Sequence, residues 1–179
     1  NHTITLHSVK RAQGRRSNRF CGPSALSALT GWDTAETAAL LRQVSGRSRI
    51  TGTHTRQMND ALRRLGMTMA SVAYHASLPA KLRPTLAQWA RANPNRGSAT
   101  YLMSVGHHWA VVQGRRYVCG LTGSIVPLKG CPKWRARVKQ VWAIHRGAGA
   151  VAAPATVLPP RESRSPADPD MHVAKELAT

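Results

Sequence analysis

The chain has 179 residues, a length that suits one domain with a core of its own. Its formal charge is +19, and the excess lies in residues 1–150, where 23 Lys and Arg face three acidic residues. There is no run of about 18 apolar residues, and the first residues lack the apolar core of a signal peptide, so neither membrane insertion nor secretion is expected. We therefore expect a soluble protein with acidic partners.

The cysteine content argues against a disulfide framework. The chain has three cysteines, an odd number: Cys21, Cys119 and Cys131. They form no Cys-x-x-Cys pair, which disfavours a common structural zinc site. A metal held by Cys119, Cys131 and a histidine is the less favoured alternative, because the spacing of the two cysteines matches no usual ligand pattern. We expect no metal, no cofactor and a reducing compartment.

The N-terminal half is predicted to be mainly helical. Residues 3–9 alternate like a short strand, and an arginine-rich loop over 10–19 follows. Three helix patterns come next: the first begins at Cys21 and closes at Gly31, the second has Asp33 or Thr34 as N-cap and ends before Gly46, and the third covers 55–66.

The C-terminal half is predicted to be mainly strands. Residues 67–74 are extended, and 84–90 form a short helix with proline in its first turn. Because helices come first and strands later, we predict an α+β fold in which an N-terminal Cys-bearing helix and further helices pack on a C-terminal antiparallel sheet. The remaining strands are expected at 99–105, 107–113, 115–119, 124–128 and 137–145.

The chain divides into two parts by composition. Residues 1–147 alternate apolar segments with turn residues, as a folded domain does. Residues 148–179 are rich in Pro and Ala and cannot bury enough apolar surface to fold alone, so we expect an extended tail.

One thiol and two histidines are candidates for nucleophilic chemistry. A helix N-terminus carries partial positive charge, so the thiol of Cys21 would be favoured there as a thiolate. Far downstream, the strand pattern over 106–112 opens with His107 and His108, either of which can complete a Cys–His pair. Neighbouring side chains of a strand point to opposite faces, so only one of the two can face the thiol.

Two stretches carry a resemblance to a known family. The sequences Arg-Phe-Cys-Gly-Pro-Ser-Ala-Leu-Ser over 19–27 and Gly-His-His-Trp-Ala-Val-Val over 106–112 resemble papain-like cysteine peptidases, especially the C39-like group. The longer stretch 19–145 is similar to small uncharacterised phage and prophage proteins, which share segments like Leu-Ala-Gln-Trp over 86–89 and Tyr-Leu-Met-Ser-Val over 101–105. The resemblance implies a papain-like fold.

The resemblance also implies roles for individual residues. Cys21 becomes the nucleophile and His108, which precedes the aromatic Trp109, the general base, with His107 as the alternative. In such a pair the imidazole takes the thiol proton, and the imidazolium later protonates the leaving group. The oxyanion would lie between the Cys21 backbone N–H and a side-chain amide from the preceding loop. Gln13 or Asn18 would supply that amide.

The third residue of the family pattern is missing. Papain-like enzymes orient the histidine with Asp or Asn, yet no Asp, Asn or Glu occurs between His108 and Gly147. Gln113 and Gln140 are the side-chain amides in this stretch, and a backbone carbonyl could also hold the ring. Since an orienting residue adds only part of the rate, both a slow Cys–His dyad and a degenerate enzyme remain open.

Clusters of basic residues point to a second kind of function. Charged faces are usually only solvated, but this excess has too few acidic residues to balance it, which favours contact with a nucleic-acid backbone or an acidic protein surface. No named nucleic-acid motif is present, so such contact would be tolerant of base sequence. The candidates are Arg15, Arg16 and Arg19 in one loop, Arg115 and Arg116 in a tight turn, and Arg135 and Arg137 on one face of a predicted strand.

Two functions from different classes follow. The first is a phage-type papain-like cysteine peptidase or amidase that hydrolyses a peptide or isopeptide-like amide. The alternative is a catalytically degenerate basic virion protein that binds nucleic acid or neighbouring coat or connector proteins through its arginine-rich faces and residues 148–179. Either protein would reside in the host cytoplasm or the phage virion, and neither would use a membrane.

Overall fold

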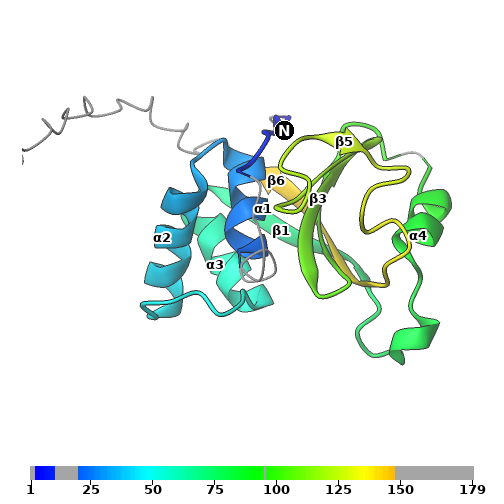
Figure 1. The fold of residues 1–179 in the computed structure, drawn as a ribbon, viewed down its shortest axis with the longest axis horizontal. Coiled ribbons are helices and arrows are strands. Elements are labelled where there is room, and N and C mark those ends of the chain that lie inside the picture. The colour runs from blue at the N-terminus through cyan, green and yellow to red at the C-terminus, as the bar shows by residue number, and fades with distance from the viewer. Residues whose placement is uncertain (1–2, 11–19, 95, 148–179) are drawn as a thin grey trace, which may run out of the picture.

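The computed structural model describes residues 3–10, 20–94 and 96–147. In this part of the chain, N-terminal helices pack on a six-stranded antiparallel sheet, which confirms the predicted α+β class (Figure 1). The predicted tail over 148–179 and all but the first residue of the predicted arginine-rich loop lie outside the described residues.

The three N-terminal helices are α1 (Cys21–Thr30), α2 (Thr34–Ser45) and α3 (Thr55–Arg64). Helix α1 ends at Gly31, which adopts φ 77° and donates its N–H to the carbonyl of Ser27. Helix α2 starts from Asp33, whose carboxylate accepts the Ala35 N–H at 2.7 Å. No helix in the described ranges combines the length and the apolar character that a membrane crossing requires.

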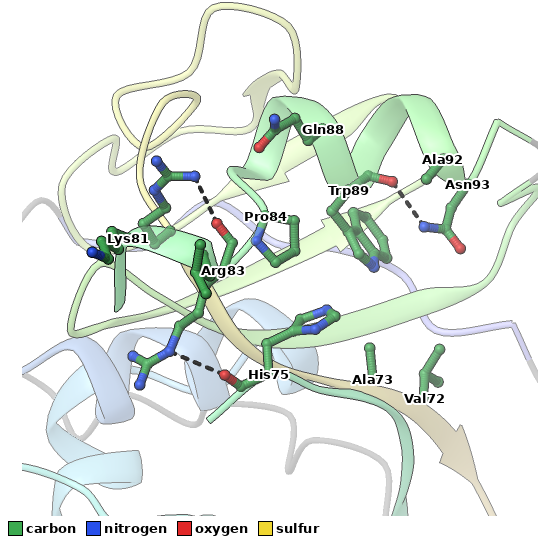
Figure 2. A pocket seen from close by; sticks show the side chains of 12 residues that line it. Val72, Ala73, His75, Lys81, Arg83, Pro84, Gln88, Trp89, Ala92 and Asn93 are labelled. Atoms are coloured by element: carbon green, nitrogen blue, oxygen red, sulfur yellow. Dashed lines mark hydrogen bonds between the residues drawn. The ribbon is translucent and has the colours of Figure 1, made fainter. Parts of the chain in front are cut away.

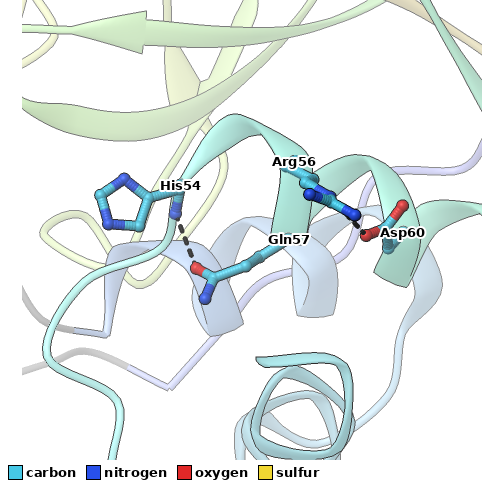
Figure 3. A network of polar contacts seen from close by, with 4 residues as sticks. All are labelled: His54, Arg56, Gln57 and Asp60. Carbon is cyan, nitrogen blue, oxygen red and sulfur yellow. Dashed lines mark hydrogen bonds and ion pairs between the residues drawn. The ribbon is translucent and has the colours of Figure 1, made fainter. Parts of the chain in front are cut away.

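Helix α3 is capped from within its own first turn (Figure 3). The backbone N–H of His54 donates to Oε1 of Gln57 at 2.9 Å, so the side chain of Gln57 folds back over the helix start. One turn along, Arg56 and Asp60 form an exposed i,i+4 pair at 4.0 Å, a type of pair that adds little stability. The cap determines where the loop before α3 ends.

The sheet follows the order β1-β6-β2-β3-β4-β5, with every neighbouring pair antiparallel. The six strands predicted from residue 67 onward are confirmed, and their ends differ from the predicted ones by at most two residues. Between β1 and β2 lie a short 3₁₀ turn, η2 (Ala80–Leu82), and helix α4 (Leu86–Ala92). The strands are β1 (Met67–Tyr74), β2 (Thr100–Val105), β3 (His108–Gln113), β4 (Arg116–Val118), β5 (Val126–Pro127) and β6 (Val138–Arg146).

Three local predictions were wrong. Residues 3–9 are not a strand: the N–H of His7 donates to the Ala28 carbonyl and that of Val9 to the Gly123 carbonyl, so the segment bonds to a helix and a loop. Helix α4 starts after Thr85, its N-cap, because the Thr85 side chain accepts the Gln88 N–H; Pro84 precedes the cap. Arg135 lies in a turn, since β6 starts only at Val138.

The sheet has a core on each face, because side chains alternate along every strand. Helices α1, α2 and α3 cover one face, and α4 with the loop after β5 covers the other (Figure 1). Along β3, Trp109 and Val111 pack on the α1 side, while Ala110 and Val112 pack on the α4 side. This alternation determines which side chains of β3 lie near Cys21.

Candidate functional site

Cys21 is the first residue of α1, and its side chain is buried. Burial raises the pKa of its thiol above the ordinary value, and Cys119 contributes to the rise. The backbone N–H groups of Trp109, Gly22 and Cys21 itself act in the opposite direction and favour the thiolate. The effect of burial is the larger, so the thiol is neutral at neutral pH although donors surround it.

The N–H of Trp109 is free for the sulfur because of how β3 begins. Gly106 and His107, at φ 53° and 58°, form a two-residue turn between β2 and β3, and Val105 pairs with His108 across it. Hydrogen bonding alternates along an antiparallel pair, so the N–H of the next residue, Trp109, points away from β2. Strand β4 pairs with β3 only from Val111 onward. No strand therefore covers the edge of β3 at Trp109, whose N–H favours the thiolate of Cys21.

His108 is a buried imidazole without partners. The residue is 1% exposed, and neither ring nitrogen has a hydrogen-bond partner among the described residues. Burial, assisted by the nearby charge of Lys133, lowers its pKa to about 4. The ring is therefore neutral at neutral pH. Buried polar groups are nearly always hydrogen-bonded, so an exception of this kind marks a candidate functional group.

The two predicted catalytic residues lie at the same end of β3. Cys21 packs in the same core cluster as Trp109, the residue directly after His108, and the Trp109 backbone lowers the pKa of the thiol. Neither nitrogen of His108 is hydrogen-bonded to that sulfur. By strand alternation His108 leaves β3 on the side of Ala110, whereas Trp109 packs with Cys21. To bond to the thiol, the imidazole must reach around the uncovered edge of the strand.

The other predicted site residues lie elsewhere. His107 is exposed in the turn before β3. Gln113 is at the far end of β3, where its Nε2 donates to the Ile4 carbonyl at 2.6 Å and to Thr100 Oγ1 at 2.8 Å, so the structure does not bring it to His108. Gln13 and Asn18 lie outside the described residues.

Three residues near Cys21 whose role was not predicted from the sequence hold the loop before α3 against the start of α1: Thr53, Gly22 and Trp109. The indole N–H of Trp109 donates to the Thr53 carbonyl at 2.8 Å. A Cβ added at Gly22 would lie 2.1 Å from Thr53 Oγ1, so the loop before α3 closes tightly over the start of α1. The glycine directly after Cys21 was a usable signal for a close approach, whereas nothing in the sequence marks Thr53.

The predicted nucleic-acid residues are spread over the molecule. Arg115 and Arg116 are exposed at the β3–β4 turn, and Arg135 is exposed in the turn before β6. Arg137 is also exposed, but it donates a hydrogen bond to the Arg83 carbonyl at 2.6 Å. Arg15, Arg16 and Arg19 lie outside the described residues.

A groove of about 710 Å³ lies between β1, η2 and α4 (Figure 2). Figure 2 shows Trp89 on one wall, Val72 and Ala73 on the other, and the side chain of Arg83 directed to the backbone of His75. Arg83 donates to the carbonyls of residues 75, 76 and 78, so its guanidinium holds the loop after β1. Neither Cys21 nor His108 lines this groove, which is therefore separate from the thiol site.

Comparison with known proteins adds no assignment. Neither a scan against models of protein families nor a search of curated proteins finds a match. Within the described ranges, no three His, Cys, Asp or Glu side chains are grouped so that they could hold a metal ion. The function must therefore be argued from the geometry around Cys21 and from the distribution of charge.

Proposed function

We propose that this protein is a phage-type thiol hydrolase that cleaves a peptide or isopeptide-like amide, with Cys21 as the nucleophile and His108 as the general base. One observation carries the proposal: Cys21 at the start of α1 is buried beside backbone N–H groups of α1 and of Trp109, and the residue before Trp109 carries a buried imidazole with two unpaired nitrogens. The papain-like assignment made from the sequence is part of this proposal.

The resting electrostatics determine the order of proton movement. Thiol and imidazole are both neutral at neutral pH, so the proton of Cys21 passes to His108 as the sulfur attacks the carbonyl carbon. The carbonyl oxygen then carries negative charge, which the backbone N–H groups at the start of α1 can stabilise. The imidazolium protonates the leaving amine, and water later hydrolyses the thioester while His108 again accepts a proton.

The missing orienting residue implies a modest rate. The Gln113 amide is bound at the other end of β3, and neither nitrogen of the His108 ring is held by a carboxylate or a carbonyl. An orienting partner fixes the tautomer of the imidazole, and its loss in a triad enzyme lowers kcat by about 10⁴. We therefore expect slow turnover, best detected as formation of the acyl-enzyme.

The test is acylation of the full chain by p-nitrophenyl acetate, with the adduct located by peptide mapping. The burst of nitrophenol should vanish in Cys21→Ala and slow by about 10²-fold or more in His108→Gln. His107→Asn is the matched control, because Asn tolerates the positive φ of this turn, and its burst should equal that of the unchanged chain. An acetyl group found only on Cys119 or Cys131, or an equal loss in both histidine variants, would contradict the proposal.

A second candidate function is a basic binding module for a polyanion in the virion. The observation that favours it is uncompensated charge: of the acidic residues in the described part, Asp33 and Glu36 cap α2, and the single ion pair found there joins Arg56 to Asp60. Binding through phosphates should weaken steeply as salt rises, because counterions are released. Retention on DNA that does not change between about 50 and 200 mM salt would contradict this candidate.

A further inference from the structure

A second hollow, of about 640 Å³, lies on the α4 side of the sheet and is lined by four basic side chains. It lies between the end of α4, the β3–β4 turn and the loop after β5, and none of the residues that line it is acidic. Its volume is within the range of about 300–1,000 Å³ that small-molecule sites occupy. The lining consists of Arg91, Arg96, Arg115 and Lys129 with Trp134, Leu128, Pro127 and Ala90.

Arg96 is held in place at this hollow by neutral groups. Its Nε donates to the Gly114 carbonyl at 3.1 Å, and a second nitrogen donates to the carbonyls of Ala90 and Asn93. The guanidinium carbon lies 5.5 Å from the centre of the Trp89 ring. These contacts pre-order the guanidinium. Because no carboxylate takes part in them, its charge remains available to a ligand.

The basic side chains also repel one another. Burial lowers the pKa of Arg96 and the nearby charge of Arg115 lowers it further, with Tyr101 acting in the opposite direction. The single ion pair in the described part of the chain lies on α3, so none of these four side chains is neutralised by an acid there. An anion in the hollow would replace this repulsion with attraction.

We propose that this hollow binds a segment of single-stranded nucleic acid, with phosphates on Arg91, Arg96, Arg115 and Lys129 and one base against Trp134. Arg91 and Arg115 can match phosphate with two parallel hydrogen bonds, and Arg96 can donate from its remaining terminal nitrogen. An indole beside a basic groove offers a face on which any base can stack. The inference rests on the second candidate function, for which it names the site, and it is independent of the chemistry at Cys21.

A matched pair of charge variants tests the site. The full chain is titrated into a labelled oligo-dT strand, followed by fluorescence anisotropy at several salt concentrations. Arg91→Gln with Lys129→Gln should weaken binding about tenfold or more and reduce the salt slope by about two. The control, Arg63→Gln with Arg64→Gln, removes the same charge from exposed positions at the end of α3 and should stay within about twofold.

Two further probes separate the possible failures. An abasic strand of the same length should bind at least about fivefold more weakly, because base stacking is lost while the phosphates remain. Equal binding of both strands would overturn the role of Trp134, and equal weakening by both double variants would overturn the site while leaving polyanion binding intact. Poly-glutamate that competes as well as the oligonucleotide would indicate an acidic protein partner instead. If the unchanged chain binds no strand, the second candidate function itself fails.

Discussion

The buried imidazole of His108 should make the protein less stable in acid. Its pKa is lowered from the ordinary 6.5 to about 4, because burial and Lys133 disfavour the charged ring. His108 has the ordinary pKa in the unfolded chain, so between pH 6.5 and 4 the unfolded chain binds a proton there that the folded protein does not bind. The free energy of unfolding therefore falls between pH 6.5 and 4 and levels off below pH 4. The two pKa values differ by about 2.5, and each unit corresponds to about 1.36 kcal/mol, so the loss is about 3 kcal/mol.

Urea unfolding between pH 4 and 8, followed by tryptophan fluorescence, measures this loss. His108→Gln carries no titrating ring, so its free energy of unfolding should fall between pH 7 and pH 4 by about 3 kcal/mol less than that of the unchanged chain. His145→Gln removes an exposed imidazole from β6 and should keep the full acid sensitivity. Because the comparison is between variants, titration of the carboxylates cancels.

The result that refutes this reasoning is an acid loss of equal size in the unchanged chain and in His108→Gln. It would mean that the imidazole gains its proton in the folded state, either from water or by pairing with a group in the protein. A second variant makes the test sharper: Lys133→Gln removes the charge that assists burial, so its acid loss should be smaller than that of the unchanged chain.

Two further predictions concern the packing that holds Cys21. Gly22→Ala should lower the free energy of unfolding by about 1–3 kcal/mol, because the new Cβ would lie 2.1 Å from Thr53 Oγ1. In urea unfolding, adding Thr53→Gly should reduce the effect of Gly22→Ala, and an unchanged effect would mean that Thr53 is not the obstacle. Trp109→Phe should lower stability by about 1–2 kcal/mol, since it removes the indole N–H that donates to the Thr53 carbonyl and part of the packing against Trp142. Thermal unfolding followed by circular dichroism measures that loss, and an unchanged melting temperature would show that the bond adds no stability.

Local signals made most of the fold predictable. Asp33 before a helix pattern and Gly46 after it predicted the two ends of α2, because a carboxylate caps free N–H groups and glycine adopts positive φ without strain. The prediction that residues 67–74 are extended is confirmed by β1, which covers the same residues. In both cases the residues that determine the element lie inside it or next to it.

Some of the predictions that failed depended on a partner distant in the chain. The alternation over residues 3–9 correctly indicated a buried face, but it could not show that the neighbours are the Ala28 and Gly123 carbonyls. The strand predicted at 107–113 began one residue too early, because Gly-His is not one of the usual pairs for a tight hairpin turn and His107 belongs to that turn. Thr53 contacts Trp109 across 56 residues of chain, a separation over which no local pattern carries information.

The balance of forces on Cys21 suggests what a substrate would have to change. Three N–H donors favour the thiolate, yet burial outweighs them and keeps the thiol neutral. A polar substrate group beside the sulfur would reduce the effect of burial while leaving the donors in place, so the thiol would become more acidic when the site is occupied. This balance between burial and the backbone donors predicts that an occupied site holds a more reactive Cys21 than an empty one.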